Sequence, residues 1–236
     1  MQDRNKLILA GFWEGNRDQA PYADDSFEVW GLNHLHPYIP RWSRWFDFHR
    51  PEWSAANLKP EVWADQDAFL RKNHGKPIYM LEARPEYPCV RPYPIDEVVR
   101  GLGRRYFTNG LAYMVALALL EGRFAEIQVW GADMRHSEEY AIQRPCFEYW
   151  LGRCEGAGIK VVIPPSAALL SAERAYGYED EGGMVGEALR AHREVLAKAL
   201  AMKDQAVSQA QTYDGVIQTE QEWIRRWEQR SRGGIL

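Results

Sequence analysis

The sequence predicts an α/β domain, a Rossmann-like and mostly parallel sheet with helices on both faces, followed by a C-terminal helical arm. Short apolar runs alternate with longer amphipathic segments between about residues 6 and 165, and this alternation is typical of strand–helix units in parallel sheets. The composition changes after about residue 178, and residues 184–227 contain no proline. We therefore expect two domains, a Rossmann-like α/β domain over residues 1–178 and a helical arm over 179–236.

Six apolar runs are predicted as strands because turn residues bound each of them. They cover residues 6–11, 27–32, 45–48, 77–81, 127–130 and 160–163. Helical spacing and capping residues predict helices at about residues 60–72, 95–102, 111–120 and 137–155. Thr108 is the candidate N-cap of the third helix. Four prolines between Arg84 and Pro94 predict an irregular segment.

The arm carries an apolar stripe at nearly heptad spacing. Its members are Val185, Leu189, Leu196, Leu200, Val207, Ile217, Ile224 and Trp227. A stripe of this length needs a partner surface, which could be the arm folded back at Gly215, the preceding domain or another subunit. We expect a coiled-coil contact between subunits and therefore a homo-oligomer.

The composition limits the classes of partner. The 236 residues have a formal net charge of -4 and a pI of about 5.9, so the strongly basic footprint of a nucleic-acid-binding protein is missing, although a local basic patch remains open. No run approaches the ~20 apolar residues of a membrane span. The three cysteines form no Cys-x-x-Cys pair, which suits a reducing compartment. We expect a cytoplasmic protein.

Polar residues follow three of the predicted strands. Asp133 comes after the run that ends in Gly131, Asn33 follows the second strand, and Asp47 and His49 belong to the third. The carboxyl ends of parallel strands meet at one edge of the sheet, where ligands of open α/β folds bind. The sequence therefore predicts a small-molecule site, and an aromatic content of 13% favours a ligand with a ring, such as a nucleotide.

Two helix starts offer further candidate site residues. Thr108, Asn109 and Gly110 begin a helix whose free N–H groups could bind phosphate, although ordinary capping explains the same residues. Glu139, at the start of the helix near residue 137, could act as a base if it is partly buried, and a solvated helix start is the alternative.

Two histidine motifs raise the alternative of a metal centre. The pairs His34-x-His36 and Asp47-x-His49 contain the ligand types of a metal-dependent hydrolase. His34 and His36 are expected in the loop that runs to Pro37, so we favour contact of His49 with a donor or an acceptor. No metal ion held by side chains is expected.

Four motifs, in this order and spacing, resemble the sialyltransferase-like family of Rossmann-type transferases. They are Leu9-Ala-Gly11, Trp30-Gly-Leu-Asn33, Phe107-Thr-Asn-Gly110 and Gly131-Ala-Asp133. The family contains bacterial lipooligosaccharide sialyltransferases and related archaeal pterin diphosphokinases. The resemblance covers about residues 6–165 and leaves the arm unexplained.

The resemblance implies a nucleotide-linked donor with Asp133 near its reacting end. The residues that would hold this donor are Gly11, Asn33, Thr108, Asn109 and Gly110. Such sialyltransferases use a histidine base in a lid region beyond the Gly-x-Asp strand, and His136 is the nearest candidate here.

The expected function is transfer of a group, a sugar by preference, from a nucleotide-activated donor to an acceptor hydroxyl. His49, His136 or Glu139 would deprotonate the acceptor, and Asp133 would orient the donor ribose or a metal-bound phosphate. One alternative is a pterin or nucleoside diphosphokinase-type enzyme that uses ATP and Mg²⁺ in the same crevice. Another is a non-catalytic nucleotide-binding or assembly protein that acts through its arm.

Overall fold

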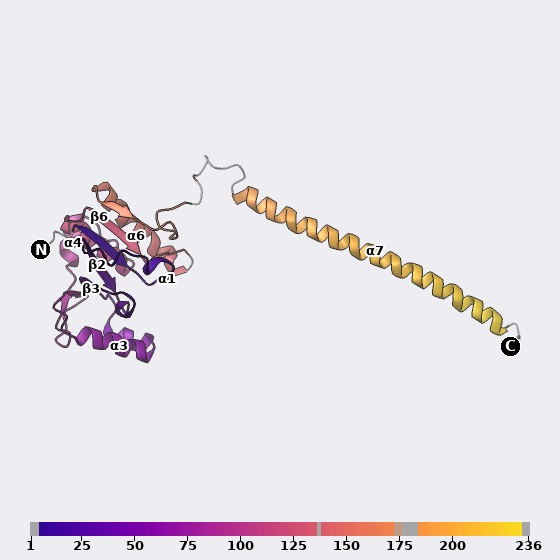
Figure 1. Cartoon of the computed structure of the whole chain (residues 1–236), viewed down its shortest axis with the longest axis horizontal. Helices are drawn as coiled ribbons and strands as arrows, with labels where there is room; N and C mark the ends of the chain where they lie inside the picture. Colours follow the sequence, from indigo (N-terminus) through magenta and orange to yellow (C-terminus); the bar gives the residue numbers. More distant parts are fainter. Residues whose placement is uncertain (1–4, 136–137, 173–174, 176–183, 233–236) are drawn as a thin grey trace. The chain divides into compact units, whose positions relative to one another are not determined.

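The computed structural model describes residues 5–135, 138–172, 175 and 184–232. The chain divides into two compact units, residues 1–172 and 173–236 (Figure 1). The boundary expected near residue 178 falls outside the described ranges and stays a prediction.

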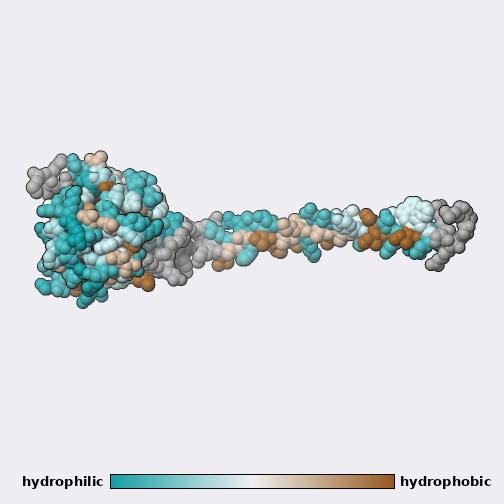
Figure 2. Space-filling model, turned by 90° about the horizontal axis from the view of Figure 1, so that it is seen from below, coloured by the Kyte–Doolittle hydropathy of each residue, from teal (hydrophilic) through white to brown (hydrophobic). Residues whose placement is uncertain are grey.

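The C-terminal unit contains one long helix, α7 (Met184–Arg232), of 49 residues. The helix is continuous through Gly215, so the fold-back at this glycine, one of the arrangements considered for the arm, is wrong. Apolar residues run along α7 beside hydrophilic ones (Figure 2). The larger of these apolar side chains are at least 47% exposed, and the C-terminal helical arm is confirmed as a helix.

The N-terminal unit is built on a sheet of seven parallel strands in the order β5-β4-β3-β2-β1-β6-β7. The strands are β1 (Lys6–Ala10), β2 (Phe27–Leu32), β3 (Arg44–Phe46), β4 (Ile78–Met80), β5 (Val90–Pro92), β6 (Glu126–Trp130) and β7 (Lys160–Val162). The predicted α/β class is confirmed. The order reverses at β1, which pairs with β2 on one side and β6 on the other, and such a reversal opens a crevice at the carboxyl edge.

Helices cover both faces of the sheet. They are α1 (Glu14–Arg17), the 3-10 turn η1 (His36–Tyr38), α2 (Pro51–Asn57), α3 (Pro60–Arg71), α4 (Ile95–Leu102), α5 (Gly110–Glu121) and α6 (Glu138–Gly156). The helix α5 packs against α4 and α6, and α2 packs against α3. Right-handed crossovers on the two sides of β1 place these two groups on opposite faces.

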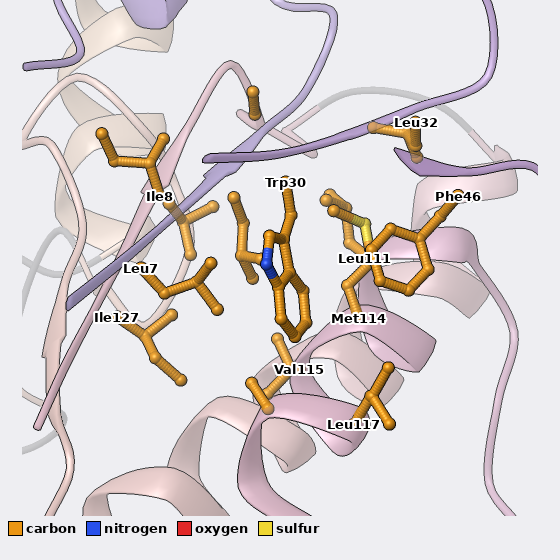
Figure 3. Packing of buried hydrophobic residues seen from close by; sticks show 14 of the residues in the cluster. Leu7, Ile8, Trp30, Leu32, Phe46, Leu111, Met114, Val115, Leu117 and Ile127 are labelled. Atoms are coloured by element: carbon orange, nitrogen blue, oxygen red, sulfur yellow. The ribbon is translucent and has the colours of Figure 1, made fainter. Parts of the chain in front are cut away.

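Trp30 of β2 lies at the centre of the core, between the sheet and α5. Leu7, Met114 and Val115 lie around its indole ring and Ile127 lies beyond Leu7 (Figure 3), and all four are fully buried. The helix α5 is apolar on almost every side because it lies between the sheet and other helices. This packing fixes the first turn of α5 beside the carboxyl edge of the sheet.

Three elements differ from the prediction. The proline-rich segment contains the strand β5, which tolerates Pro92 because it is an edge strand. The helix α1 lies in a stretch predicted as a loop, and α2 was not predicted. Both are short, four and seven residues, so they give too few turns for an apolar period to emerge.

Among the described residues, no helix combines the length and the apolar character needed to cross a membrane.

Candidate functional site

A pocket of about 750 Å³ opens at the carboxyl ends of β1, β2, β3 and β6. Loops that follow these strands form its walls, together with the first turn of α5. The predicted site residues that line it are Gly11, Asn33, His49, Thr108, Asn109, Gly110 and Asp133. The volume falls within the usual range for small-molecule sites.

The floor of the pocket is a crossing of two backbone segments. Gly11 follows β1 and Gly131 follows β6, and the amide of Trp13 donates to the carbonyl oxygen of Gly131 at 2.8 Å. A Cβ atom on either glycine would collide with the carbonyl oxygen of the other, and Gly131 also has a φ of +76°. Glycine is therefore required at both positions.

Asn16, which the sequence analysis missed, stabilises this floor through a hydrogen bond to Gly131. It is fully buried in α1, where its Oδ1 accepts from the amide of Gly131 at 2.6 Å and its Nδ2 donates to Ser166 Oγ at 3.1 Å. One side chain thus connects the loops after β6 and β7. Asparagine in a polar loop is common, so its sequence position alone gave no signal.

Asn33 follows β2 with a φ of +51°, a conformation that asparagine tolerates better than most residues. Its amide donates to Phe46 at 2.8 Å, and its carbonyl oxygen accepts from the indole of Trp45 at 2.8 Å. Within the described residues, no hydrogen bond involves its side-chain amide. The backbone of Asn33 is therefore committed to the fold, while its side chain is available to a ligand.

The start of α5 differs from the prediction in its capping residue. Asn109, not Thr108, is the N-cap, and its Oδ1 accepts from the amide of Ala112 at 2.8 Å. Thr108 Oγ1 donates to Ile142 at 3.2 Å, and Asn109 Nδ2 donates to Gln143 at 3.0 Å. Both side chains thus bind α6, and the groups that face a ligand here are the N–H groups of the first turn.

One wall of the pocket is a ladder of aromatic rings. Phe48 stacks on Tyr113 with ring centroids 4.3 Å apart, and Phe107 stacks on the same tyrosine at 4.4 Å. Trp150 extends the ladder below Phe107 at 5.2 Å. These contacts fix the rings in place, so the wall offers a rigid apolar surface to a flat ligand.

Asp133 lies where the sequence predicts it, with a side chain that is 20% exposed. Its Oδ1 accepts from the amide of Ala168 at 3.1 Å and lies 3.5 Å from Arg135 Nε. Arg135 also donates to the carbonyl oxygen of Ser166 at 3.0 Å. The carboxylate therefore anchors the loop after β7, and its second oxygen makes no hydrogen bond with the residues that the structure describes, so it is left for a ligand.

His49 lies at the pocket beside a buried carboxylate. Its Nδ1 is 3.3 Å from Asp47 Oδ1, which also accepts from the amide of His49 at 3.0 Å. The other oxygen of Asp47 accepts from Gln66 Nε2 at 2.8 Å, in the interior. The imidazole stacks on Trp53 with centroids 4.7 Å apart. Because Nδ1 faces Asp47, Nε2 is the nitrogen free for chemistry.

The other two histidines of the metal alternative pack against aromatic rings, although His34 remains close enough to Asp47 and His49 for their charges to act on its pKa. His36 Nε2 lies 2.9 Å from Asp65 and its ring stacks on Phe69, while His34 packs against Phe12. Burial lowers the pKa of both imidazoles and favours their neutral forms. The described part of the chain contains no group of three His, Cys, Asp or Glu side chains able to hold a metal ion.

Two predicted catalytic residues cannot be placed in the same way. His136 lies outside the described residues, and Glu139 belongs to α6 but its side chain lies outside the described part. Both stay predictions.

The chain was also compared with known proteins. No protein-family model matches it, and no curated protein matches it. A solved structure of the sialyltransferase CstII from Campylobacter jejuni, in complex with the substrate analogue cytidine-5'-monophosphate, aligns with 71% of this chain and 85% of that chain. The TM-score is 0.40 and the sequence identity 15%. Similarity at this level does not assign the chain to a family, so its function has to follow from its own pocket.

Proposed function

We propose that this protein transfers a group, a sugar by preference, from a nucleotide-activated donor to an acceptor hydroxyl. The observation that carries the proposal is the pocket at the switch point of the sheet. It combines the free N–H groups of a helix start, a rigid aromatic wall and a histidine held by a buried carboxylate.

The donor would occupy the crevice between the floor and the aromatic wall. Its phosphate would accept from the first-turn N–H groups of α5, where the helix dipole favours an anion. Its base would lie against Phe48, the outer ring of the stack on Tyr113, with the Asn33 amide as hydrogen-bond partner. Asp133 would accept from the ribose hydroxyls through the oxygen that does not bind Ala168.

His49 would be the general base. Its Nε2 would take the proton from the acceptor hydroxyl as the acceptor oxygen attacks the anomeric carbon of the donor sugar. The bond between that carbon and the phosphate oxygen would break, and the nucleotide would leave with its charge stabilised at the α5 start. Asp47 would stabilise the imidazolium that forms. His136 and Glu139 stay alternative bases.

The second candidate is a diphosphokinase-type reaction with ATP and Mg²⁺. Asp133 favours it, because this carboxylate lies in the pocket where a phosphate-bound Mg²⁺ needs an oxygen ligand. The pocket would then bind the triphosphate along the same helix start.

A ligand screen followed by a turnover assay tests these candidates. Thermal shifts would be measured with cytidine, uridine and guanosine nucleotide sugars, the matching free nucleotides, and ATP with Mg²⁺. A ligand at one hundred times its Kd should add ~2.7 kcal/mol to the free energy of unfolding. Nuclear magnetic resonance would then follow the bound compounds with simple acceptors.

The outcomes separate the functions. Release of a nucleotide coupled to a new glycosidic bond supports the proposal, while diphosphate transfer from ATP supports the second candidate. Tight binding without turnover of any donor indicates a non-catalytic nucleotide-binding protein. No shift with any nucleotide would contradict all three.

A further inference from the structure

The helix α7 carries a seam of residues at alternating spacings of three and four. The first seam positions are Leu189, Leu196, Lys203, Ala210, Ile217 and Ile224. The second positions, three residues further along, are His192, Ala199, Ala206, Tyr213, Glu220 and Trp227. This is the spacing of the two core positions of a coiled coil. The seam therefore has the geometry to pack against another helix.

Two charged residues interrupt the apolar seam. Lys203 and Glu220 occupy core positions of opposite type, and both are exposed along α7. A charged group in the core of a coiled coil is costly unless the partner helix supplies the opposite charge. The partner of α7 must therefore present an acid opposite Lys203 and a base opposite Glu220.

A second copy of α7 meets both requirements in one orientation only. In a parallel, in-register pair, like positions face each other, so Lys203 would lie opposite the partner's Lys203 and Glu220 opposite the partner's Glu220. In an antiparallel pair, first positions face second positions. With the two-fold axis between Gln211 and Thr212, Lys203 lies opposite the partner's Glu220, and symmetry repeats the pair.

The same register also matches large side chains to small ones. Ile224 lies opposite the partner's Ala199, Ile217 opposite the partner's Ala206, and Tyr213 opposite the partner's Ala210. In the parallel pair, alanine would face alanine and leave cavities in the core. A slide of the antiparallel pair by one heptad puts Glu220 opposite the partner's Leu196 or the partner's Ala210, and leaves Lys203 without an acid.

The charge of α7 favours a protein partner over an anionic surface. Residues 184–232 contain eight Lys or Arg and seven Asp or Glu, a net charge of +1. Charges of both signs occur along the helix, as in the pair of Arg226 and Glu222, 3.8 Å apart. A membrane or a nucleic acid would instead select a helix with a basic excess.

We propose that α7 pairs with α7 of a second copy as an antiparallel coiled coil centred between Gln211 and Thr212, with Lys203 and the partner's Glu220 as its buried ion pairs. This inference is independent of the reaction in the pocket, and its tests need no substrate.

Charge reversal tests the ion pairs in the full-length chain. Sedimentation equilibrium should show a dimer. Lys203→Glu and Glu220→Lys should each raise its dissociation constant by a factor of about ten or more, because each substitution places two like charges opposite each other at both symmetry-related ion pairs. The double variant Lys203→Glu/Glu220→Lys should restore the dimer. Lys198→Glu, outside the seam, is the matched control and should leave the dimer unchanged.

Cysteine cross-linking tests the orientation. A mixture of Ala199→Cys and Ile224→Cys chains should form a disulfide between unlike chains under mild oxidation. Each variant alone should not, because its cysteines lie far from the axis. The native cysteines, Cys89, Cys146 and Cys154, are buried, and the unmodified chain is the control.

Three results would overturn the proposal. The first is a monomer at about 50 µM, a concentration at which a dimer with a micromolar Kd is almost fully formed. The second is a dimer that is insensitive to both charge reversals. The third is a disulfide in Ala199→Cys alone, as a parallel pair would give.

Cooperative melting of each variant shows that the N-terminal unit remains folded.

Discussion

At the scale of single residues, some polar side chains of the pocket stabilise the fold, and others are available to a ligand. Asn109 and Asn16 use their amides to hold backbone segments together. Asn33 uses its backbone for the same purpose, and its amide remains for a ligand. Three asparagines near one crevice therefore have different roles, which residue type alone does not reveal.

Removal of the Asn33 amide should weaken nucleotide binding by about 1–3 kcal/mol, because a buried group on the ligand loses its partner. Asn33→Gly is the cleaner variant, since alanine at a φ of +51° adds strain of about 1–2 kcal/mol. Titration calorimetry with the ligand found by the screen measures the change. Equal affinity in the glycine variant would show that Asn33 is only a turn residue.

His49→Ala should reduce turnover by a factor of roughly 10²–10⁴, because the variant lacks the general base. The melting temperature should stay nearly unchanged, because the imidazole is not part of the hydrophobic core. Asp47→Asn should lower kcat as well, since the amide cannot stabilise the imidazolium. His74→Gln, outside the pocket, serves as the matched control. Full activity in His49→Ala would move the role of base to His136 or Glu139.

The sequence was most informative where a polar residue follows directly after an apolar strand. Gly131 followed by Asp133, and Asn33 after an apolar strand, correctly predicted which residues would meet at the sheet edge. It was least informative where neighbours compete for the same role. Thr108 and Asn109 are both good caps, and the backbone geometry that selects Asn109 depends on the contacts of both residues with α6.

At the scale of elements, six of the seven strands and the long helices followed from the apolar pattern of the sequence. The strand β5 and the short helices α1 and α2 did not. The strand β5 has three residues, and the pairing that defines it comes from β4, which no local pattern encodes. The rings of the aromatic wall come from four separate segments, after β3, before α5, within α5 and within α6. Only the fold brings them together, so the sequence could suggest ring binding but not its place.

The crossing of the loops after β1 and β6 should be intolerant of any side chain. Gly11→Ala should lower the free energy of unfolding by about 2 kcal/mol or more, because its Cβ meets backbone that cannot rotate away. Gly152→Ala on α6, where a Cβ meets nothing within 4 Å, should instead raise it by about 0.5–1 kcal/mol. Urea denaturation of the two variants measures both changes.

Buried thiol and phenol groups, Cys154 and Tyr22 among them, should make the N-terminal unit sensitive to alkali. Burial raises the pKa of Cys154 from 9.0 to about 12, and that of Tyr22 from 10.0 to about 12. Between pH 9 and 12 the unfolded chain loses these protons and the folded chain keeps them, so stability falls as pH rises, by up to ~1.4 kcal/mol per pH unit for each group. Urea midpoints measured from pH 8 to 11 test this.

Cys154→Ala is the matched variant for that titration. It should be less stable at pH 8, because it leaves a cavity in the core, and its stability should fall less steeply above pH 9. Equal slopes in the two proteins would show that Cys154 contributes nothing to the alkaline loss.

At the scale of the whole molecule, the arm should determine assembly and the N-terminal unit should determine ligand binding. Deletion of residues 179–236 is expected to convert the oligomer into a monomer, as sedimentation velocity would show, without changing the affinity for a nucleotide. Loss of binding in the truncated chain would show that the arm also takes part in the site. In the antiparallel pair, the two arms begin at opposite ends of a rod of roughly 80 Å.

The backbone floor of the pocket has a consequence for how its selectivity could be changed. Because main-chain atoms of Gly11 and Gly131 form that floor, its shape does not depend on any rotamer. Exchange of a wall residue such as Phe48 would therefore reshape the space for base or sugar while the floor stays constant. Variants with new donor preferences should be obtainable from the walls alone.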